Sequence, residues 1–171
     1  MIPIILKILK TGIVTERTPA AREEWRERAS AIQDEILQIL GRALVIRQVD
    51  AGSCTGCELE INALSNPYYN IEGLGIRFAA SPRHADLLLV TGPVAKHMEQ
   101  ALKIAYEAMP EPKLVVAVGD CGRDGGIFGE GYATCGGVSH VIPVDVVVPG
   151  CPPPPAAILQ GILTAISRGA T

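Results

Sequence analysis

From residue 43 onwards, short apolar runs alternate with segments of helical periodicity, and this alternation restricts the fold more than any other feature. The apolar runs predict strands at residues 43–49, 75–79, 87–90, 114–118 and 144–148. The periodicity between them predicts helices at residues 57–65, 94–109 and 155–169. Unbroken apolar runs are typical of strands that are buried on both faces of a parallel sheet. The sequence therefore predicts an α/β domain with a doubly wound, mainly parallel sheet.

The first 41 residues look like a helical extension of this domain, which we place at residues 42–171. Thr18 and Pro19 suit the first turn of a helix, and Gly41 suits its end. Between them, apolar side chains recur at spacings of three and four, namely Trp25, Ala29, Ile32, Ile36 and Ile39. Residues 1–10 are apolar except for Lys7 and Lys10. This amphipathic start fits a membrane surface or a partner, and equally a helix that packs on its own domain.

Composition narrows the class of protein further. Hydrophobic residues make up 48% of the chain and charged residues 19%, which excludes a disordered chain and suggests a surface that partners cover. No apolar stretch reaches the roughly 20 residues of a membrane span, and the first residues lack the charge order of a secretory signal. We therefore expect a cytoplasmic protein without a span of its own. Residues 48–171 carry 7 Lys or Arg against 12 Asp or Glu, which gives nucleic-acid binding little electrostatic support.

Four of the five cysteines directly follow predicted strands. Cys54 and Cys57 come after the first strand, Cys121 after the strand at 114–118, and Cys151 after the strand at 144–148. Because the carboxyl ends of parallel strands share one edge of a sheet, we expect these four thiols to converge. Grouped cysteines in a reducing compartment more often bind metal or carry out redox chemistry than form disulfides.

Both zinc and iron–sulfur clusters accept four cysteine ligands. Structural zinc usually takes two close pairs, whereas here one pair meets two isolated cysteines. Each isolated cysteine lies among glycine or proline, in Gly119-Asp-Cys-Gly122 and in Pro149-Gly-Cys-Pro152. Such backbone lets a bulky group approach closely and directs amide donors towards its sulfurs. This pattern favours a 4Fe–4S cluster over zinc.

Other interpretations explain fewer residues. A thioredoxin-like pair at Cys54 and Cys57 leaves the other two strand-end cysteines unexplained. The glycine-rich loop at residues 119–131 resembles a phosphate cradle but lacks the lysine of a P-loop. The three histidines, His84, His97 and His140, have no metal-ligand spacing, and Cys135 has no evident mate.

Three blocks of the chain resemble a known family. They are residues 50–61 with Cys54-Thr-Gly-Cys57-Glu-Leu-Glu60, residues 81–93 with Ser81-Pro-Arg-His-Ala-Asp86, and residues 144–153 with Pro149-Gly-Cys-Pro-Pro153. Together they resemble the small subunit of membrane-bound, energy-converting [NiFe] hydrogenases of the formate hydrogenlyase type. That subunit is homologous to the 20 kDa iron–sulfur subunit of complex I. The resemblance covers residues 45–167.

The resemblance implies a flavodoxin-like fold and one proximal 4Fe–4S cluster held by Cys54, Cys57, Cys121 and Cys151. It implies an electron-transfer subunit on the cytoplasmic side of the membrane. The expected partners are a nickel–iron large subunit, a ferredoxin-like iron–sulfur subunit, and integral membrane subunits of the antiporter or quinone-site type. The isolated chain is not expected to be catalytic, because Cys135 alone remains for nickel. The N-terminal extension is expected to dock near the membrane.

Two details bear on the choice within this superfamily. The complex I subunit has two adjacent cysteines in its first motif, whereas Thr55 and Gly56 separate them here, as in hydrogenases. Related sulfur-reducing complexes share this separation, so a quinone- or sulfur-reducing complex is the alternative. Pro154 stands where the family commonly has arginine. Glu58 and Glu60 are candidates for proton handling or for contact with the large subunit, with a structural role as the alternative.

Overall fold

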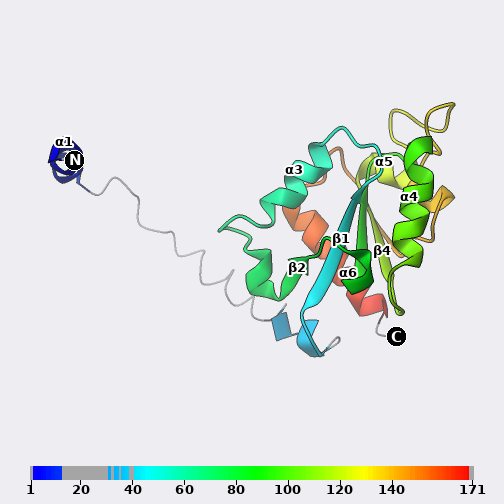
Figure 1. Ribbon diagram of the computed structural model, residues 1–171, viewed down its shortest axis with the longest axis horizontal. Helices are drawn as coiled ribbons and strands as arrows, with labels where there is room; N and C mark the ends of the chain where they lie inside the picture. Colours follow the sequence, from blue (N-terminus) through cyan, green and yellow to red (C-terminus); the bar gives the residue numbers. More distant parts are fainter. Residues whose placement is uncertain (1, 13–30, 32, 35, 39–40, 170–171) are drawn as a thin grey trace.

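The computed structural model describes residues 2–12, 31, 33–34, 36–38 and 41–169 (Figure 1). The strands are β1 (Leu44–Asp50), β2 (Ile76–Phe78), β3 (Leu87–Thr91), β4 (Leu114–Val118) and β5 (Val146–Val148). The helices are α1 (Ile2–Thr11), α3 (Gly56–Ala63), α4 (Lys96–Glu107), α5 (Gly119–Asp124) and α6 (Pro155–Gly169). Short 3₁₀ turns occupy η1 (Ile71–Leu74), η2 (Pro82–His84) and η3 (Val138–His140).

The five strands form one sheet in the order β2-β1-β3-β4-β5, and every neighbouring pair is parallel. This order is that of flavodoxin-like folds, so the predicted doubly wound α/β class is confirmed. The chain first builds outwards from β1 to β2 and then returns to add β3, β4 and β5 on the other side of β1. The change of direction lies between β1 and β3, where ligands of such sheets bind at the carboxyl edge.

Helices cover both faces of the sheet (Figure 1). On one face, α3 and α6 bury an apolar cluster that includes Ile46, Ile61, Leu89, Val116 and Ile162. On the other face, α4 covers a second cluster that includes Val90, Val94, Leu102 and Ala117. Because β3 and β4 contribute buried residues to both clusters, their unbroken apolar sequence is explained.

Helix α5 lies where the sequence suggested only a glycine-rich loop. Gly119 has a φ of 85° and Gly125 a φ of 95°, so positive-φ glycines stand at both ends of the helix. The residues between them form one helical turn directly after β4. Glycine content signalled a loop, whereas the glycines in fact mark the boundaries of a short helix.

Part of the N-terminal extension contacts the sheet domain. Ile36 is buried in the cluster beneath α3 and α6. The N–H of Gly41 donates to the carbonyl of Leu37 at 2.9 Å, and Gly41 has a φ of 64°, which is a common helix end. Trp25, Ala29, Ile32, Ile39, Thr18 and Pro19 lie outside the described residues. No helix in the described part of the chain is long and apolar enough to cross a membrane.

Asp86 connects three strands at the amino edge of the sheet. Its carboxylate accepts hydrogen bonds from the backbone N–H of Val45 at 3.0 Å and from both terminal nitrogens of Arg42. Its own N–H donates to the carbonyl of Val45, and its carbonyl accepts from Leu114 at the start of β4. Asp86 is only 7% exposed, so these bonds form away from bulk water.

We expect Asp86→Ala to lower the free energy of unfolding by about 2–3 kcal/mol, because the buried N–H of Val45 loses its acceptor. Asp86→Asn keeps the shape and one carbonyl acceptor, so it should cost about half as much. Urea denaturation followed by circular dichroism measures both. Equal stability of Asp86→Ala and the parent chain would show that this network contributes nothing.

Candidate functional site

The turn after β1 is shaped by side chains that bind its own backbone. Asp50 Oδ1 accepts from the N–H groups of Gly52 and Ser53 at 2.9 and 2.8 Å. Ser53 Oγ accepts from the N–H of Thr55 and donates to Glu58 Oε2 at 2.5 Å. These bonds fix the segment that carries Cys54 and starts α3.

This turn crosses over the end of β3. The N–H of Ala51 donates to the carbonyl of Thr91, and the N–H of Ala95 donates to the carbonyl of Ala51. Beneath it, Gly92 has a φ of 80°, and a Cβ there would lie 2.4 Å from the backbone nitrogen of Ser53. Because Gly92 has no side chain, the turn after β1 can pack directly on the end of β3. The turn therefore extends across β3 towards the ends of β4 and β5.

The segments that carry Cys121 and Cys151 are joined through the residues that precede them. The N–H of Asp120 donates to the carbonyl of Gly150 at 2.9 Å. In return, the N–H of Gly150 donates to Asp120 Oδ1 at 3.1 Å. This reciprocal pair holds the ends of β4 and β5 in register just where each cysteine begins.

The structure brings the four predicted cysteines together at the carboxyl edge of the sheet. A Cβ at Gly119 would lie 2.7 Å from Cys57 Sγ, so Cys57 stands over the start of α5. Gly56 lies near both Cys54 Sγ and the ring of Pro152. Cys57 is buried, Cys121 is half-buried, and Cys54 and Cys151 are exposed.

The thiols influence one another electrostatically. Burial, with smaller contributions from the charge of Glu58 and from the three other thiols, raises the pKa of Cys57 from 9.0 to about 12. Burial also raises the pKa of Cys121, with Cys151 and Cys54 as the next causes. The raised pKa values keep Cys57 and Cys121 protonated when no cation is bound, so a bound cation is what would make these two groups thiolates.

These residues fit an iron–sulfur cluster. Four thiols from three strand ends supply its usual ligand set. Gly119 and Gly126 leave room at the sulfurs, since a Cβ at Gly126 would lie 2.9 Å from Cys121 Sγ. Within the described ranges, no group of three or more His, Cys, Asp or Glu is placed to hold a single metal ion.

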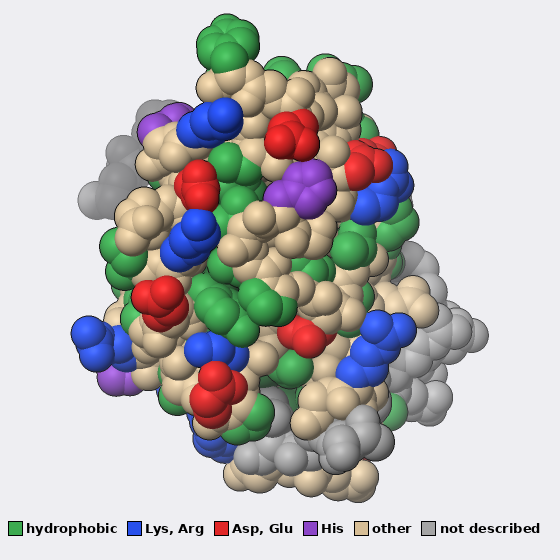
Figure 2. Space-filling model, turned by 90° about the vertical axis from the view of Figure 1, so that its right-hand side faces the viewer, with side chains coloured by type: hydrophobic (Ala, Val, Ile, Leu, Met, Phe, Trp, Pro, Cys, Tyr) green, Lys and Arg blue, Asp and Glu red, His purple; other side chains and the backbone are tan. Residues whose placement is uncertain are grey.

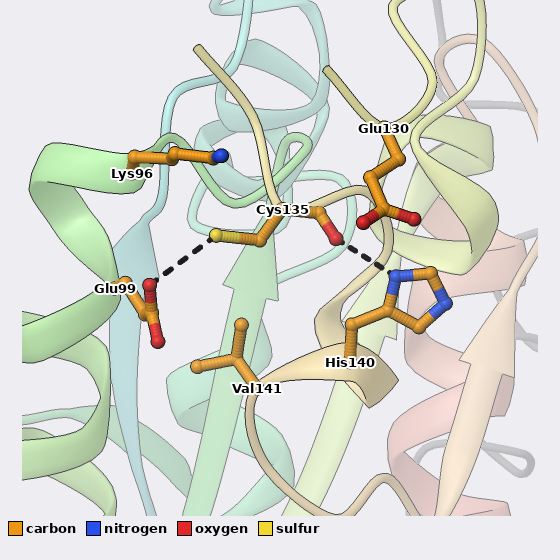
Figure 3. A pocket seen from close by; sticks show the side chains of 6 residues that line it. All are labelled: Lys96, Glu99, Glu130, Cys135, His140 and Val141. Atoms are coloured by element: carbon orange, nitrogen blue, oxygen red, sulfur yellow. Dashed lines mark hydrogen bonds between the residues drawn. The ribbon is translucent and has the colours of Figure 1, made fainter. Parts of the chain in front are cut away.

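Cys135 lies in a different place, in a pocket of about 380 Å³ between α4 and η3 (Figure 3). Its thiol lies 3.5 Å from Glu99 Oε2 and donates to it, and its carbonyl accepts from His140 Nδ1 at 2.8 Å. Burial and Glu99 raise its pKa. The pocket is lined by Lys96, Glu99, Glu130, Cys135, His140 and Val141.

Glu58 and Glu60 differ in their surroundings. Glu58 is 8% exposed, and its Oε2 accepts a hydrogen bond from the hydroxyl of Ser53. Its Oε1 has no hydrogen-bond partner among the described residues. Glu60 is only half-buried.

Sequence reasoning missed Asp50 and Asp120, which shape the cysteine-bearing turns. An aspartate at or just after the end of a strand, within a few residues of a cysteine, was the available signal.

Exposed apolar side chains flank this edge. Leu59 follows Cys57 on α3, and Ile127 and Phe128 lie on the loop after α5; they are 64%, 91% and 54% exposed. That loop projects beyond the helices near the top of Figure 1.

On the face of the molecule in Figure 2, basic and acidic side chains are interspersed among hydrophobic ones. This face carries no field of a single sign.

The cluster-free chain offers a direct test of the buried thiol. At pH 8, a pKa of about 12 leaves Cys57 with about 1000-fold less thiolate than an ordinary thiol of pKa 9.0. We therefore expect iodoacetamide to label the exposed Cys54 and Cys151 first, and Cys57 only as the pH approaches 12. Mass spectrometry of peptides measures the order, with the urea-unfolded chain as control. Equal labelling of all four in the folded chain would contradict the burial of Cys57.

The fold and the cysteine edge together define a class of protein: a flavodoxin-like α/β subunit with four convergent cysteines at the ends of its strands. Comparison with known proteins places the chain within this class. The family model described as NADH ubiquinone oxidoreductase, 20 Kd subunit, matches residues 54–165. This chain belongs to that family. The assignment to a subunit of a multisubunit oxidoreductase of the hydrogenase type is confirmed.

Individual relatives of this chain are subunits of hydrogenase-type or respiratory complexes. The chain is 44% identical over 134 residues to the probable membrane-bound hydrogenase subunit mbhJ of Pyrococcus furiosus, covering 78% of this chain and 80% of the relative. It is 41% identical over 140 residues to formate hydrogenlyase subunit 7 of Escherichia coli, covering 82% of this chain and 55% of the relative. A chain of the solved membrane-bound sulfane sulfur reductase, an archaeal respiratory membrane complex, is 36% identical with a TM-score of 0.65, covering 75% of this chain and 71% of that one.

Proposed function

We propose that this chain carries one 4Fe–4S cluster on Cys54, Cys57, Cys121 and Cys151. Through it, electrons pass between a ferredoxin-type subunit and a nickel–iron site on the large subunit of a membrane-bound hydrogenase. The observation that carries the proposal is the meeting of four thiols from the ends of β1, β4 and β5 at one edge of the sheet. The similarity to two hydrogenase-type relatives supports the choice of reaction.

When bound, the cluster supplies a one-electron carrier. The residues of this chain would position the cluster and shield part of it from solvent. Cys57 is held in a buried position over Gly119, whereas Cys54 and Cys151 stand at the surface. The raised pKa of Cys57 means that its proton must leave when iron binds, so cluster insertion releases protons. The half-exposed arrangement leaves one side of the site open to a partner.

Partner contact at this edge follows from the exposed apolar side chains. Leu59 lies on α3, which bears Cys57, and Ile127 and Phe128 lie on the loop that follows α5, the helix that bears Cys121. Exposed apolar and aromatic groups around a buried centre are typical of a subunit interface. We assign this surface to the large subunit. Pro154, which stands at the family's usual arginine position, is exposed beside Cys151, so any arginine contact made by relatives is missing here.

A sulfur- or quinone-reducing complex is the second candidate, and the similarity to the sulfane sulfur reductase supports it. This chain has the separated cysteine pair of both classes, so the large subunit decides between them. A hydrogenase requires two Cys-x-x-Cys pairs for nickel on that subunit. Their absence there would favour the second candidate and leave the cluster assignment intact.

The domain division and the location complete the proposal. We take residues 42–171 as the cluster-binding domain and residues 1–41 as an extension. The subunit would lie peripherally on the cytoplasmic side of the cell membrane. Its further partners would be a ferredoxin-like subunit and integral membrane subunits of the antiporter or quinone-site type.

Anaerobic purification of the chain with its complex tests the central claim. Iron and acid-labile sulfide should be present in the amounts of one 4Fe–4S cluster for each copy of this chain, beyond those of the other subunits. Electron paramagnetic resonance of the reduced chain should show its signal. A colourless chain with one zinc and no iron would contradict the proposal and favour a structural zinc site.

A further inference from the structure

Helix α1 presents an apolar stripe that nothing in the described part of the chain covers. Ile5, Ile8 and Leu9 recur at spacings of three and four, so they lie on one side of the helix. They are 55%, 63% and 74% exposed, and Leu6 beside them is 61% exposed. These side chains therefore form an exposed apolar stripe along α1.

The opposite side of α1 is basic. Lys7 and Lys10 are three residues apart and share that side, and the helix contains no acidic residue. Gly12, with a φ of 67°, closes the helix by donating its N–H to the carbonyl of Ile8 at 3.0 Å. Lys10 thus lies in the last turn, where a cation also interacts favourably with the helix dipole. The side of α1 opposite the stripe therefore carries both lysines of the helix and no acidic side chain.

The length of α1 limits how it can meet a membrane. Its 10 residues span about 15 Å, half of the roughly 30 Å hydrocarbon layer of a bilayer. It is too short to cross, but its division into two sides suits a helix that lies in the plane of the interface. There the lysine stems can extend along the apolar layer while the ammonium groups reach the headgroups.

We propose that α1 binds the surface of an anionic lipid bilayer, with Ile5, Ile8 and Leu9 among the acyl chains and with Lys7 and Lys10 at the headgroups. The charge of the helix selects this occupant, since the cytoplasmic leaflet carries negative charge that two lysines without any acid complement. The proposal rests on the proposed function, which makes this chain a peripheral subunit of a membrane complex. It adds to that function the helix that contacts the membrane, α1, and the kind of lipid that the helix binds.

Flotation of the full chain, with its cluster, on vesicles tests this. The probes are vesicles of phosphatidylcholine alone and of phosphatidylcholine with phosphatidylglycerol. We expect tighter binding to the second kind. Lys7→Gln with Lys10→Gln should lower binding to the anionic vesicles about 25-fold, since each lysine contributes about fivefold, or about 1 kcal/mol. Binding to neutral vesicles should stay the same.

Ile8→Asp with Leu9→Asp should abolish binding to both kinds of vesicle. Ile104→Asp on α4, a site that is also 55% exposed, is the matched control and should leave binding unchanged. If the α1 variants float like the parent chain, the proposal is wrong. If they float normally but no longer co-purify with the other subunits in detergent, the stripe binds a protein groove instead.

Cluster content, measured by iron analysis and visible spectrum on the same samples, separates the two proposals. Variants of α1 that keep the cluster but lose the vesicles support the lipid assignment. A parent chain that binds vesicles but never contains iron would contradict the proposed function alone.

Discussion

Replacing Cys121 by alanine should remove the cluster and reduce electron transfer through the assembled complex to background. Loss of a residue that merely supports a metal ligand costs about 10- to 100-fold in metal affinity, so loss of a ligand itself should exceed about 100-fold. The side chain is half-buried and small, so the fold should survive with a loss of about 1–2 kcal/mol. Iron and sulfide analysis, the spectrum of the reduced complex and ferredoxin reduction measure the result.

Cys135→Ala is the matched control in the same chain. Cys135 is also half-buried, but its thiol donates to Glu99 in the separate pocket beside η3. The variant should therefore keep its iron and its electron transfer. Full iron content in Cys121→Ala would show that Cys121 is no ligand. Loss of iron in Cys135→Ala would show that the set of four is wrongly chosen.

The sheet could be predicted from sequence because burial on two faces leaves an unmistakable pattern. The strand at 114–118 was predicted with the bounds that the structure has, since nearly all of its side chains are buried. Boundaries that depend on single contacts were less accurate. The last strand begins at Val146 rather than at residue 144, after Asp145 has accepted a hydrogen bond from the N–H of Val115. Helix α5 was missed because its bounding glycines were interpreted as a loop.

The meeting of the cysteines could be predicted because strand ends share an edge, whatever the contacts between them. What sequence could not show is how the pair after β1 reaches across β3. That step depends on the hydrogen bonds of Ala51 and on the space above Gly92, which join residues about 40 positions apart. The burial of Cys57, and hence its raised pKa, follows from the same packing.

Gly92→Ala should displace the turn that carries Cys54 and so lower both stability and cluster content. A Cβ at Gly92 would lie 2.4 Å from the nitrogen and 2.7 Å from the Cα of Ser53, which are backbone atoms that no rotamer change can move. A side chain at a φ of 80° alone costs about 1–2 kcal/mol. With the displaced backbone, we expect a loss of at least about 3 kcal/mol and substoichiometric iron.

Gly129→Ala isolates the two causes. Gly129 has a φ of 57°, but a Cβ there would meet nothing within 4 Å. It should therefore cost only the conformational strain of about 1–2 kcal/mol and leave the iron content unchanged. Urea denaturation and iron analysis of both variants measure the difference. If the two variants lose the same stability and both keep their iron, the crossing over Gly92 does not position Cys54. If Gly92→Ala alone loses iron, the contact between Gly92 and Ser53 is what carries the first cysteine pair to the ends of β4 and β5.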